Sequence, residues 1–362
     1  MSKAKSMASV STVAALAAGM ALATCGGGGG GGGPAVALLL PESKTARYES
    51  QDRPHFTARL KQACPGCSLI YSNADQDASK QQQQAEAALT QGAKVLVLDP
   101  VDAASASVIV QRAKQQKVPV ISYDRLITNA DIDYYVSFDN VHVGQLQAQT
   151  LVKKLRSGGP TGSIIMINGA PTDNNAKLFK QGALSVMNTS GFKIAKQYDT
   201  PDWSPDQAQN EMQQAITAVG NNGFVGVYAA NDGTAGGAIA AMKAAGIKPA
   251  ARPTTGQDAE LDAIQRILTG EQYMTVYKAV KPEAAAAADL AAALALGRAA
   301  PSGVVNQKVN NGLKPVPSVI LTPVAVTKAN VKDTVIKDGF WKASQVCTGS
   351  FAAVCRSAGI SG

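Results

Sequence analysis

Short apolar segments alternate with longer amphipathic segments from residue 35 onward, with a repeat of roughly 25 to 30 residues. Turn residues bound the apolar segments, several of which are rich in β-branched residues: AVALLL, SLIYSN, KVLVLD, VPVISY, SIIMIN, FVGVYA and YMTVY. The segments between them, such as ASKQQQQAEAALTQG and SPDQAQNEMQQAITAV, open near Asp or Ser and close near Gly, which is typical of helices. This alternation predicts an α/β fold built from βαβ units, with open parallel sheets buried on both faces.

The length of the chain favours more than one such unit. Its 362 residues are too many for one small core and suit two domains of roughly 120 to 180 residues each. An apolar content of 45% with 17% charged residues is typical of an ordinary folded protein.

Polar residues gather where the apolar segments end. Six predicted strands stop at such residues, namely at Asp99, at Asp124 with Arg125, at Asn174 with Asn175, at Asn231 with Asp232, at Gln257 with Asp258, and at Lys278. Open parallel sheets bind ligands at the carboxyl ends of their strands. The pattern therefore predicts a polar ligand held between two sheets.

The residue types at these strand ends suit a neutral sugar. Each sugar hydroxyl both donates and accepts a hydrogen bond, so carboxylates accept from it while Arg, Lys and Asn donate to it. The apolar C–H face of a sugar ring packs on an aromatic ring, which Trp203 or Tyr48 could supply. A mismatched hydroxyl leaves a buried polar group unpaired at a cost of roughly 1–3 kcal/mol, which gives such a site its selectivity.

Catalytic and cofactor chemistry find little support. The two histidines, His55 and His142, fall within predicted helices without an acidic neighbour in sequence, so no nucleophile–base pair is evident. We find no metal-ligand spacing, and no dinucleotide fingerprint follows the first strand, so we expect no metal, no cofactor and no enzymatic activity. The net charge of +8 is spread without a basic block, which disfavours nucleic-acid binding.

The N-terminus has the features of an export signal. Lys3 and Lys5 precede the apolar stretch VSTVAALAAGMALAT, which is too short to span a bilayer, so residues 1–24 are predicted to be a signal peptide. The sequence LATC before a glycine run resembles a lipoprotein cleavage box. That resemblance implies a lipid on Cys25 and a Gly-rich tether over residues 25–34, although Thr24 departs from the usual small residues. The alternative is a plain secreted protein with an incidental cysteine.

Four cysteines remain beyond Cys25. Export makes disulfides the natural expectation, and the simplest arrangement pairs Cys64 with Cys67 and Cys347 with Cys355. The CPGC motif could instead form a redox dithiol or half of a zinc site. A redox dithiol usually opens a helix, whereas this one lies in a predicted turn before a strand, which favours a structural bridge.

Five stretches resemble the periplasmic sugar-binding proteins of ABC importers, of the ribose/galactose-binding type: YDRLITNADIDYYVSFDN, PTDNNAKLF, NDGTAGGAI, TGQDAE and MTVYK. They follow the order and spacing of the family over most of residues 35–335. The resemblance implies a type I periplasmic binding protein fold, in which two Rossmann-like lobes are joined by three crossings and close over one sugar. It implies an N-terminal lobe made of residues 35–139 and 280–315, and a C-terminal lobe made of residues 140–279 and 316–362.

The resemblance also implies a function and a set of sugar contacts. The protein would be a monomer outside the cytoplasm, held to the membrane only through its lipid. It would capture a xylose-like pentose or an aldohexose, without a cofactor, for an ABC permease. The contacts fall on Arg47, Tyr48, Asp124, Arg125, Asn175, Trp203, Asn231, Asp258 and Lys278. Tyr48 stands where a family member has Trp. Because the loop KTARYESQDR has room for an extra residue, the alignment of Arg47 and Tyr48 with the family's contact positions is the least fixed of the set.

Several of these positions have simpler interpretations. Asp124 could cap a turn, Arg125 could form a surface ion pair, and Trp203 could belong to the core. Lys278 could mark a crossing without touching the sugar. Of Asn231 and Asp232, Asp232 is the expected helix cap.

The apolar segment YYVSF ends in Asp139 and Asn140, which we interpret as a hinge pair rather than as ligand contacts.

Three other functions share some features of a periplasmic sugar-binding protein. A sugar-responsive repressor would need an N-terminal DNA-binding domain in place of the export signal. An exported sugar-modifying enzyme would need a catalytic acid and base, and a sensory lipoprotein would pass its sugar-bound state to a receptor.

Overall fold

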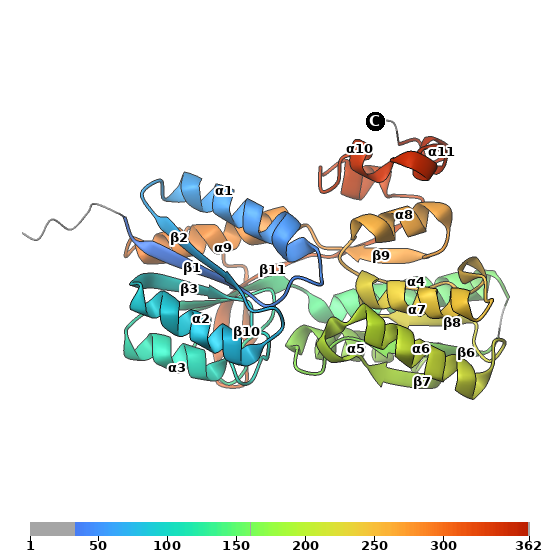
Figure 1. The fold of residues 1–362 in the computed structure, drawn as a ribbon. Helices are drawn as coiled ribbons and strands as arrows, with labels where there is room; N and C mark the ends of the chain where they lie inside the picture. Colours follow the sequence, from blue (N-terminus) through green and yellow to red (C-terminus); the bar gives the residue numbers. More distant parts are fainter. Residues whose placement is uncertain (1–32, 160, 361–362) are drawn as a thin grey trace, which may run out of the picture. The chain divides into compact units, whose positions relative to one another are not determined.

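A computed structural model describes residues 33–159 and 161–360, and the predicted signal peptide and Cys25 lie outside these residues. The described chain forms two α/β lobes (Figure 1). The first lobe contains a seven-stranded sheet in the order β10-β11-β5-β4-β3-β1-β2, in which every pairing is parallel except that of β10 with β11. Its strands are β1 (Ala35–Leu40), β2 (Ser68–Asn73), β3 (Ala93–Leu98), β4 (Val120–Tyr123), β5 (Tyr134–Phe138), β10 (Gln307–Asn310) and β11 (Pro315–Leu321).

Helices cover both faces of the first sheet. On one face lie α1 (Arg53–Ala63) and α9 (Val280–Ala295), and on the other lie α2 (Ala78–Thr90) and α3 (Ser107–Gln115). The segment AVALLL shows why this strand is apolar throughout. Val36, Leu38 and Leu40 pack under α1 and α9, whereas Ala37 and Leu39 pack under α2 and α3. A short helical turn, η1 (Tyr48–Asp52), precedes α1.

The second lobe repeats this plan with a sheet in two parts. One part has the order β7-β6-β8 and the other is the antiparallel pair β12-β9. The segment 254–257 lies between them, because Thr254 bridges Val227 of β8 and Gln257 bridges Val276 of β9. The strands are β6 (Ser163–Asn168), β7 (Lys193–Asp199), β8 (Gly226–Ala229), β9 (Met274–Tyr277) and β12 (Val324–Thr327).

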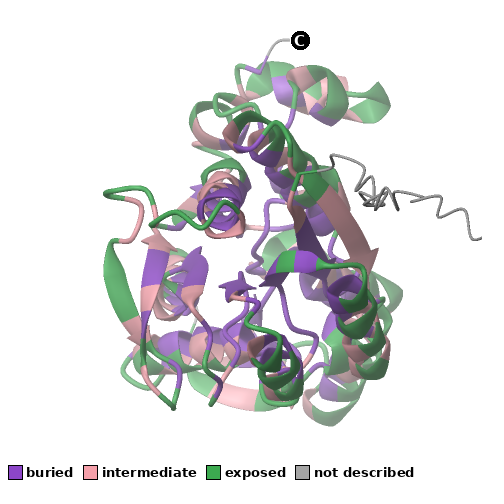
Figure 2. Ribbon diagram, turned by 90° about the vertical axis from the view of Figure 1, so that its left-hand side faces the viewer, coloured by how far each residue is buried: buried purple, intermediate pink, exposed green. Residues whose placement is uncertain are grey.

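Helices also cover both faces of the second lobe, where β6, β8 and β9 are buried and the edge strands β7 and β12 are partly exposed. Across the described chain, exposed residues lie mainly on the outer surfaces of helices and in loops, and buried residues lie toward the interior (Figure 2). One apolar cluster includes residues of α4 and α5, a second those of α6 and α7, and a third those of α8 and the C-terminus. The helices are α4 (Asn140–Ser157), α5 (Asn174–Met187), α6 (Pro205–Val219), α7 (Asp232–Ala244) and α8 (Leu261–Thr269), with the turns η2 (Pro201–Trp203) and η3 (Pro249–Ala251). The C-terminus adds η4 (Lys332–Ile336), α10 (Ala343–Val346), η5 (Gly349–Phe351) and α11 (Ala352–Ser357).

Three short connections join the lobes, from β5 to α4, from β9 to α9 and from β11 to β12. The boundary predicted at residue 315 is wrong, because β11 pairs in parallel with β5 in the first sheet. We therefore propose lobes of 33–138 with 280–321 and of 140–279 with 324–360. Asp139 lies in the first connection, where its side chain caps α4 at His142 N (3.0 Å) and its N–H donates to Leu321 O (3.0 Å).

The cysteines form two bridges, Cys64 to Cys67 and Cys347 to Cys355, in the pairings expected from the sequence. The first bridge lies in the turn between α1 and β2. Within residues 33–159 and 161–360, none of the helices has the length and hydropathy needed to cross a bilayer. The predicted α/β fold, with parallel sheets in two lobes, is confirmed.

Candidate functional site

A pocket of about 260 Å³ lies between the lobes, at the carboxyl ends of their strands. Every contact residue predicted from the sequence lines it except Arg47. The lining comprises Thr45, Tyr48, Asp124 and Arg125 from the first lobe and Asp173, Asn175, Phe179, Trp203, Asn231, Gln257, Asp258 and Lys278 from the second.

Asp124 lies at the centre of the pocket's charge network. It follows β4 with φ of +50°, a left-handed conformation that Asp tolerates better than most residues. Its carboxylate accepts from Lys278 Nζ (3.2 Å) and from the Tyr48 hydroxyl (3.3 Å), and it lies 3.4 Å from Arg47 Nη1. Burial would raise the pKa of Asp124, but the charges of Arg47, Lys278 and Arg125 outweigh it and hold that pKa well below its usual range. Asp124 is therefore a permanent acceptor, not merely a turn cap.

Arg47 lies behind Asp124 rather than at the pocket surface. Its Nε and Nη2 bind Asp52 (2.9 and 2.6 Å), and Nη2 also binds Glu283 (2.7 Å) at the start of α9. Nη1 is buried without a hydrogen-bond partner among the described residues. The guanidinium also lies over the Tyr48 ring, 5.4 Å from its centroid. The structure thus brings Arg47 next to Asp124 and Tyr48, and a direct contact of Arg47 with a ligand stays a prediction.

Arg125 is buried, so the interpretation as a surface ion pair is wrong. Its Nε lies 3.0 Å from Asp173 of the second lobe and 3.7 Å from Asp99, and its Nη1 donates to Pro100 O (3.3 Å). Burial raises the pKa of Asp99 and of Asp173, although Arg125 opposes this effect. The Arg125–Asp173 pair joins the two lobes beside the pocket. Sequence reasoning missed Asp173, because its partner lies on the other lobe.

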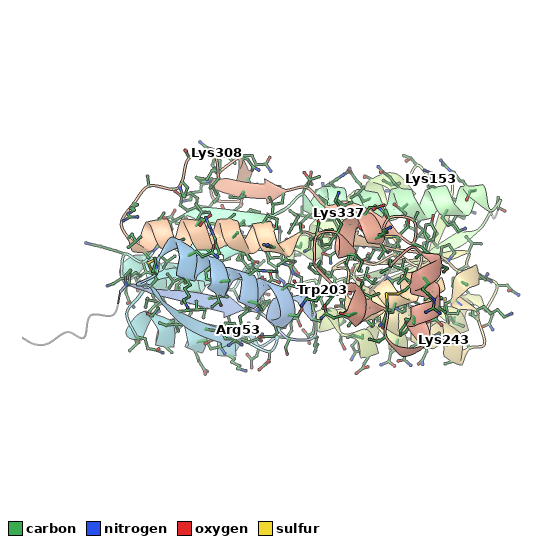
Figure 3. All side chains as sticks on the ribbon, turned by 90° about the horizontal axis from the view of Figure 1, so that it is seen from above. Arg53, Lys153, Trp203, Lys243, Lys308 and Lys337 are labelled. Atoms are coloured by element: carbon green, nitrogen blue, oxygen red, sulfur yellow. A yellow bond between two sulfur atoms is a disulfide. The ribbon has the colours of Figure 1, made fainter. Side chains whose placement is uncertain are left out.

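Two aromatic rings line the second-lobe side of the pocket. Trp203 donates its indole N–H to Asp173 Oδ2 (3.1 Å), and its ring meets that of Phe179 edge to face at 6.3 Å. Gly169 makes room for the indole, since an added Cβ there would lie 2.0 Å from Cη2 of Trp203. Figure 3 shows Trp203 where the lobes meet, whereas Lys153 and Lys308 lie at the outer edges. Phe179 was missed, although its spacing of four residues from Asn175 places both on one face of α5.

The two predicted asparagines also serve the protein itself. Asn175 donates to the main-chain oxygen of Asp124 across the lobes (3.1 Å) and accepts from Asn140 (2.9 Å). Asn231, not Asp232, caps α7, because its Oδ1 accepts from Thr234 N (2.8 Å) in a capping box. The expectation that Asp232 is the cap is therefore wrong.

Asp258 and Lys278 complete the second-lobe wall. Lys278 Nζ lies 3.2 Å from Asp124 and 3.8 Å from Asp258, so Lys278 pairs with both lobes. Gln257, which the sequence only suggested as a strand end, donates to Asp258 Oδ2 (3.1 Å). Burial raises the pKa of Asp258, while Lys278 and Arg47 lower it. Lys278 directly precedes the crossing to α9 and also lines the pocket, so it combines both interpretations.

The pocket therefore offers charged donors, carboxylate and amide acceptors and aromatic rings, on both lobes. His55 and His142 lie outside its lining. In the described part of the chain, no group of three or more His, Cys, Asp or Glu residues is arranged to hold a metal ion. Such a set of groups can bind a polyhydroxylated ligand by charge-assisted hydrogen bonds.

Comparisons with known proteins agree with this geometry. Residues 36–299 match a family described as the periplasmic binding protein domain. The chain is 39% identical to the D-xylose-binding periplasmic protein of Escherichia coli (strain K12) over 315 residues, which are 86% of this chain and 92% of that protein. It is 34% identical over 328 residues to the multiple sugar-binding periplasmic receptor ChvE of Rhizobium radiobacter, with 86% and 92% of the two chains covered.

A solved structure is similar throughout its length. It is a carbohydrate transporter solute binding protein from Chloroflexus aurantiacus in complex with D-glucose, with a TM-score of 0.77 and 31% sequence identity. The similarity covers 86% of this chain and 97% of that one. By their names, these similar proteins are binding proteins and not enzymes.

Proposed function

This chain belongs to the periplasmic binding protein family, and we propose that it captures one monosaccharide between its lobes and delivers it to an ABC sugar permease. One observation carries the proposal. Each lobe contributes charged groups to a single small pocket, and Asp124 and Arg125 of one lobe already pair with Lys278 and Asp173 of the other. A sugar hydroxyl that enters this network can donate to a carboxylate and accept from a cation at once.

The mechanism is capture without chemistry. In an open form each lobe presents half of the polar groups to water, and the sugar bridges them as the three connections bend and the cleft closes. Trp203 and Tyr48 cover the apolar faces of the ring, and water is excluded. An affinity near the micromolar level corresponds to about −8 kcal/mol, which some ten hydrogen bonds can supply after the costs of closure.

The ligand we propose is a xylose-like pentose or an aldohexose. The pocket is lined by charged, amide and aromatic side chains of both lobes, and the similar proteins bind D-xylose, several sugars or D-glucose by their names. We assign direct contacts to Tyr48, Asp124, Arg125, Asn175, Trp203, Asn231, Asp258 and Lys278, with Arg47 held behind Asp124.

Calorimetric titration with a panel of pentoses and aldohexoses tests this function. We expect saturable heat with one molecule of sugar per chain for at least one member of the panel. Heat with none of them would refute the proposal. Recovery of the bound sugar, chemically unaltered after incubation, excludes a sugar-modifying enzyme.

The protein acts outside the cytoplasm as a monomer anchored by a lipid on Cys25. The LATC sequence after an apolar segment and the glycine run after it support this part of the proposal. The Cys25→Ser variant should leave the membrane fraction and appear in the soluble extracytoplasmic fraction, with unchanged sugar affinity. A wild-type protein recovered without lipid by mass spectrometry would leave a plain exported binding protein. Whether the captured sugar also signals to a receptor is decided by the partner that the closed form binds.

A further inference from the structure

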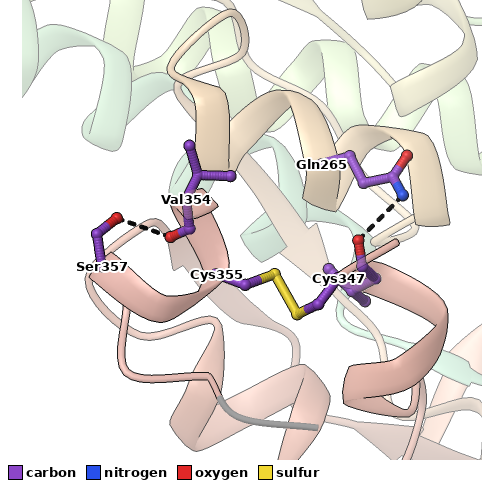
Figure 4. Close-up of a disulfide and its surroundings, with 6 residues drawn as sticks. Gln265, Cys347, Val354, Cys355 and Ser357 are labelled. Carbon is purple, nitrogen blue, oxygen red and sulfur yellow. Dashed lines mark hydrogen bonds between the residues drawn. A yellow bond between two sulfur atoms is a disulfide. The ribbon is translucent and has the colours of Figure 1, made fainter. Parts of the chain in front are cut away.

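The last 33 described residues, 328–360, form a segment that packs on the second lobe beside the pocket. We call residues 328–360 the C-terminal segment. Its Val331, Val335 and Val346 join the apolar cluster of α8 and β9. The bridge between Cys347 and Cys355 closes its end, and Gln265 of α8 donates to Val346 O at 3.1 Å (Figure 4). The segment is thus firmly attached to the second lobe.

Two aromatic residues of this segment support pocket residues from behind. Trp341 donates its indole N–H to the main-chain oxygen of Ala259 (2.8 Å), next to Asp258. Asp258 and Ala259 both have positive φ, +100° and +52°, a conformation that non-glycine residues adopt only when their surroundings hold them there. Phe340 meets Tyr277 edge to face at 5.2 Å, one residue before Lys278.

The same segment also touches the first lobe. Gln51, three residues after the pocket residue Tyr48, donates its side-chain amide to the main-chain oxygen of Phe340 (3.1 Å). Gln51 lies in η1, which belongs to the first lobe, and it is 6% exposed. In the open form that we propose, both groups would regain water, so this bond would contribute to the closed form alone.

We propose that the C-terminal segment is part of the sugar-binding machinery, with Phe340 and Trp341 as positioning residues. Trp341 holds Asp258 at the pocket and Phe340 holds Lys278 there. When the cleft closes, the main-chain oxygen of Phe340 accepts a hydrogen bond from Gln51 of the first lobe. This inference rests on the proposed sugar-binding function. It extends the site to residues that contact no sugar themselves.

Gln51→Ala, with Gln265→Ala as its matched control, tests the inference. Each variant loses one glutamine side chain that donates to a main-chain oxygen of the C-terminal segment. Gln51 reaches that segment from the other lobe, whereas Gln265 reaches it from the same lobe. We expect Gln51→Ala to weaken binding of D-xylose or D-glucose between about two-fold and ten-fold, through faster dissociation. Gln265→Ala should lower the melting temperature and leave the affinity within two-fold.

A second variant tests the support of Asp258. Trp341→Phe keeps an aromatic ring in the core but removes the donor to Ala259. We expect Trp341→Phe to weaken sugar binding, whereas Val331→Ala, which removes only packing from the same apolar cluster, should lower the melting temperature and leave the affinity within two-fold. The inference is overturned if Gln51→Ala and Trp341→Phe both bind sugar as the wild type does, or if Gln265→Ala weakens binding as much as Gln51→Ala. A wild-type chain that binds no sugar would instead refute the function on which the inference rests.

Discussion

Asp124 is the residue on which the pocket depends most. It is the only acceptor through which the described structure joins Arg47, Tyr48 and Lys278. We expect Asp124→Asn, which keeps the shape of the side chain, to weaken sugar binding at least ~100-fold, because a buried ion pair that loses one partner costs about 3–5 kcal/mol. Calorimetry of the variant with the sugar that binds the wild type measures this loss.

The matched control for that change is Asp289→Asn. Asp289 pairs with Arg59 between α9 and α1, and the Arg59 side chain is 42% exposed. Such a pair contributes about 0–1 kcal/mol to stability and has no part in the pocket, so affinity should not change. If the two variants bound sugar equally well, Asp124 would have no special role in binding.

The sequence predicted the pocket better than it predicted the pairings inside it. Asp124, Arg125, Asp258 and Lys278 follow strands, and the geometry of parallel sheets brings such residues together. Asp173 and Phe179 were missed, because their roles depend on a residue of the other lobe and on the rotation of α5. The choice of Asp232 as a cap failed for a similar reason. Its carboxylate is used by Thr275 and Gln272, which are distant in sequence.

At the scale of elements, α5 presents Asn175 and Phe179 because it lies very close to α4. Gly144 of α4 makes this approach possible, since an added Cβ would lie 1.9 Å from the main-chain oxygen of Phe179. We expect Gly144→Ala to lower the free energy of unfolding by about 1–3 kcal/mol and to weaken sugar binding, because the helices must separate. Denaturant unfolding and calorimetry measure the two effects.

Gly233 provides the comparison for Gly144. It also lies in a helix, α7, but the nearest atom to an added Cβ is 3.5 Å away, at Pro205. Gly233→Ala should therefore stabilise the protein by about 0.5–1 kcal/mol through helix propensity alone. Equal effects of the two substitutions would show that the α4–α5 contact does not limit the position of α5.

Asp232 joins the start of α7 to β9 and to the segment before α8. It accepts from Thr275 Oγ1 (2.9 Å), Gln272 (2.7 Å) and Glu260 N (3.0 Å). Burial raises the pKa of Asp232 to about 7 from an ordinary 3.8, against the opposing charge of Arg266. Burial likewise raises the pKa of the neighbouring Glu260. Between about pH 4 and pH 7 the folded chain therefore keeps a proton that the unfolded chain has already released near pH 4.

The consequence is a stability that falls as the pH rises. Across the window from about pH 4 to about pH 7, retention of one proton lowers the free energy of unfolding by about 1.4 kcal/mol per pH unit, and above pH 7 this contribution is constant. Denaturant unfolding from pH 4.5 to pH 8 should show a slope that is smaller by about this amount in Asp232→Asn. Asp124 does not interfere, because its low pKa places its effect below pH 4. Identical slopes would mean that Asp232 is ionised throughout.

At the scale of the whole molecule, the alternation of strands and helices predicted an α/β fold with parallel sheets, the length of the chain predicted two domains, and the family resemblance implied two lobes. The alternation could not predict the boundary after β11, because PVPSVIL could pair in either lobe by its composition alone. The position of β11 beside β5 is set by the tertiary structure and places the first and third connections next to each other. The hinge assigned to Asp139 and Asn140 agrees with this arrangement, since Asp139 N–H binds Leu321 O there.

Ligand binding and global stability are linked through the contacts that cross the cleft. A sugar that binds only the closed, folded chain stabilises it by about 2.7 kcal/mol at a concentration of 100 times Kd, and by about 1.4 kcal/mol more for each further ten-fold. We expect the melting temperature to rise with the logarithm of D-glucose or D-xylose concentration, whichever binds. Asp124→Asn should need at least ~100-fold more sugar for the same rise. Sucrose serves as the control, because its exclusion from the protein surface stabilises folded chains without a binding site. A rise of equal size with sucrose would mean that the stabilisation comes from the solvent and not from the cleft.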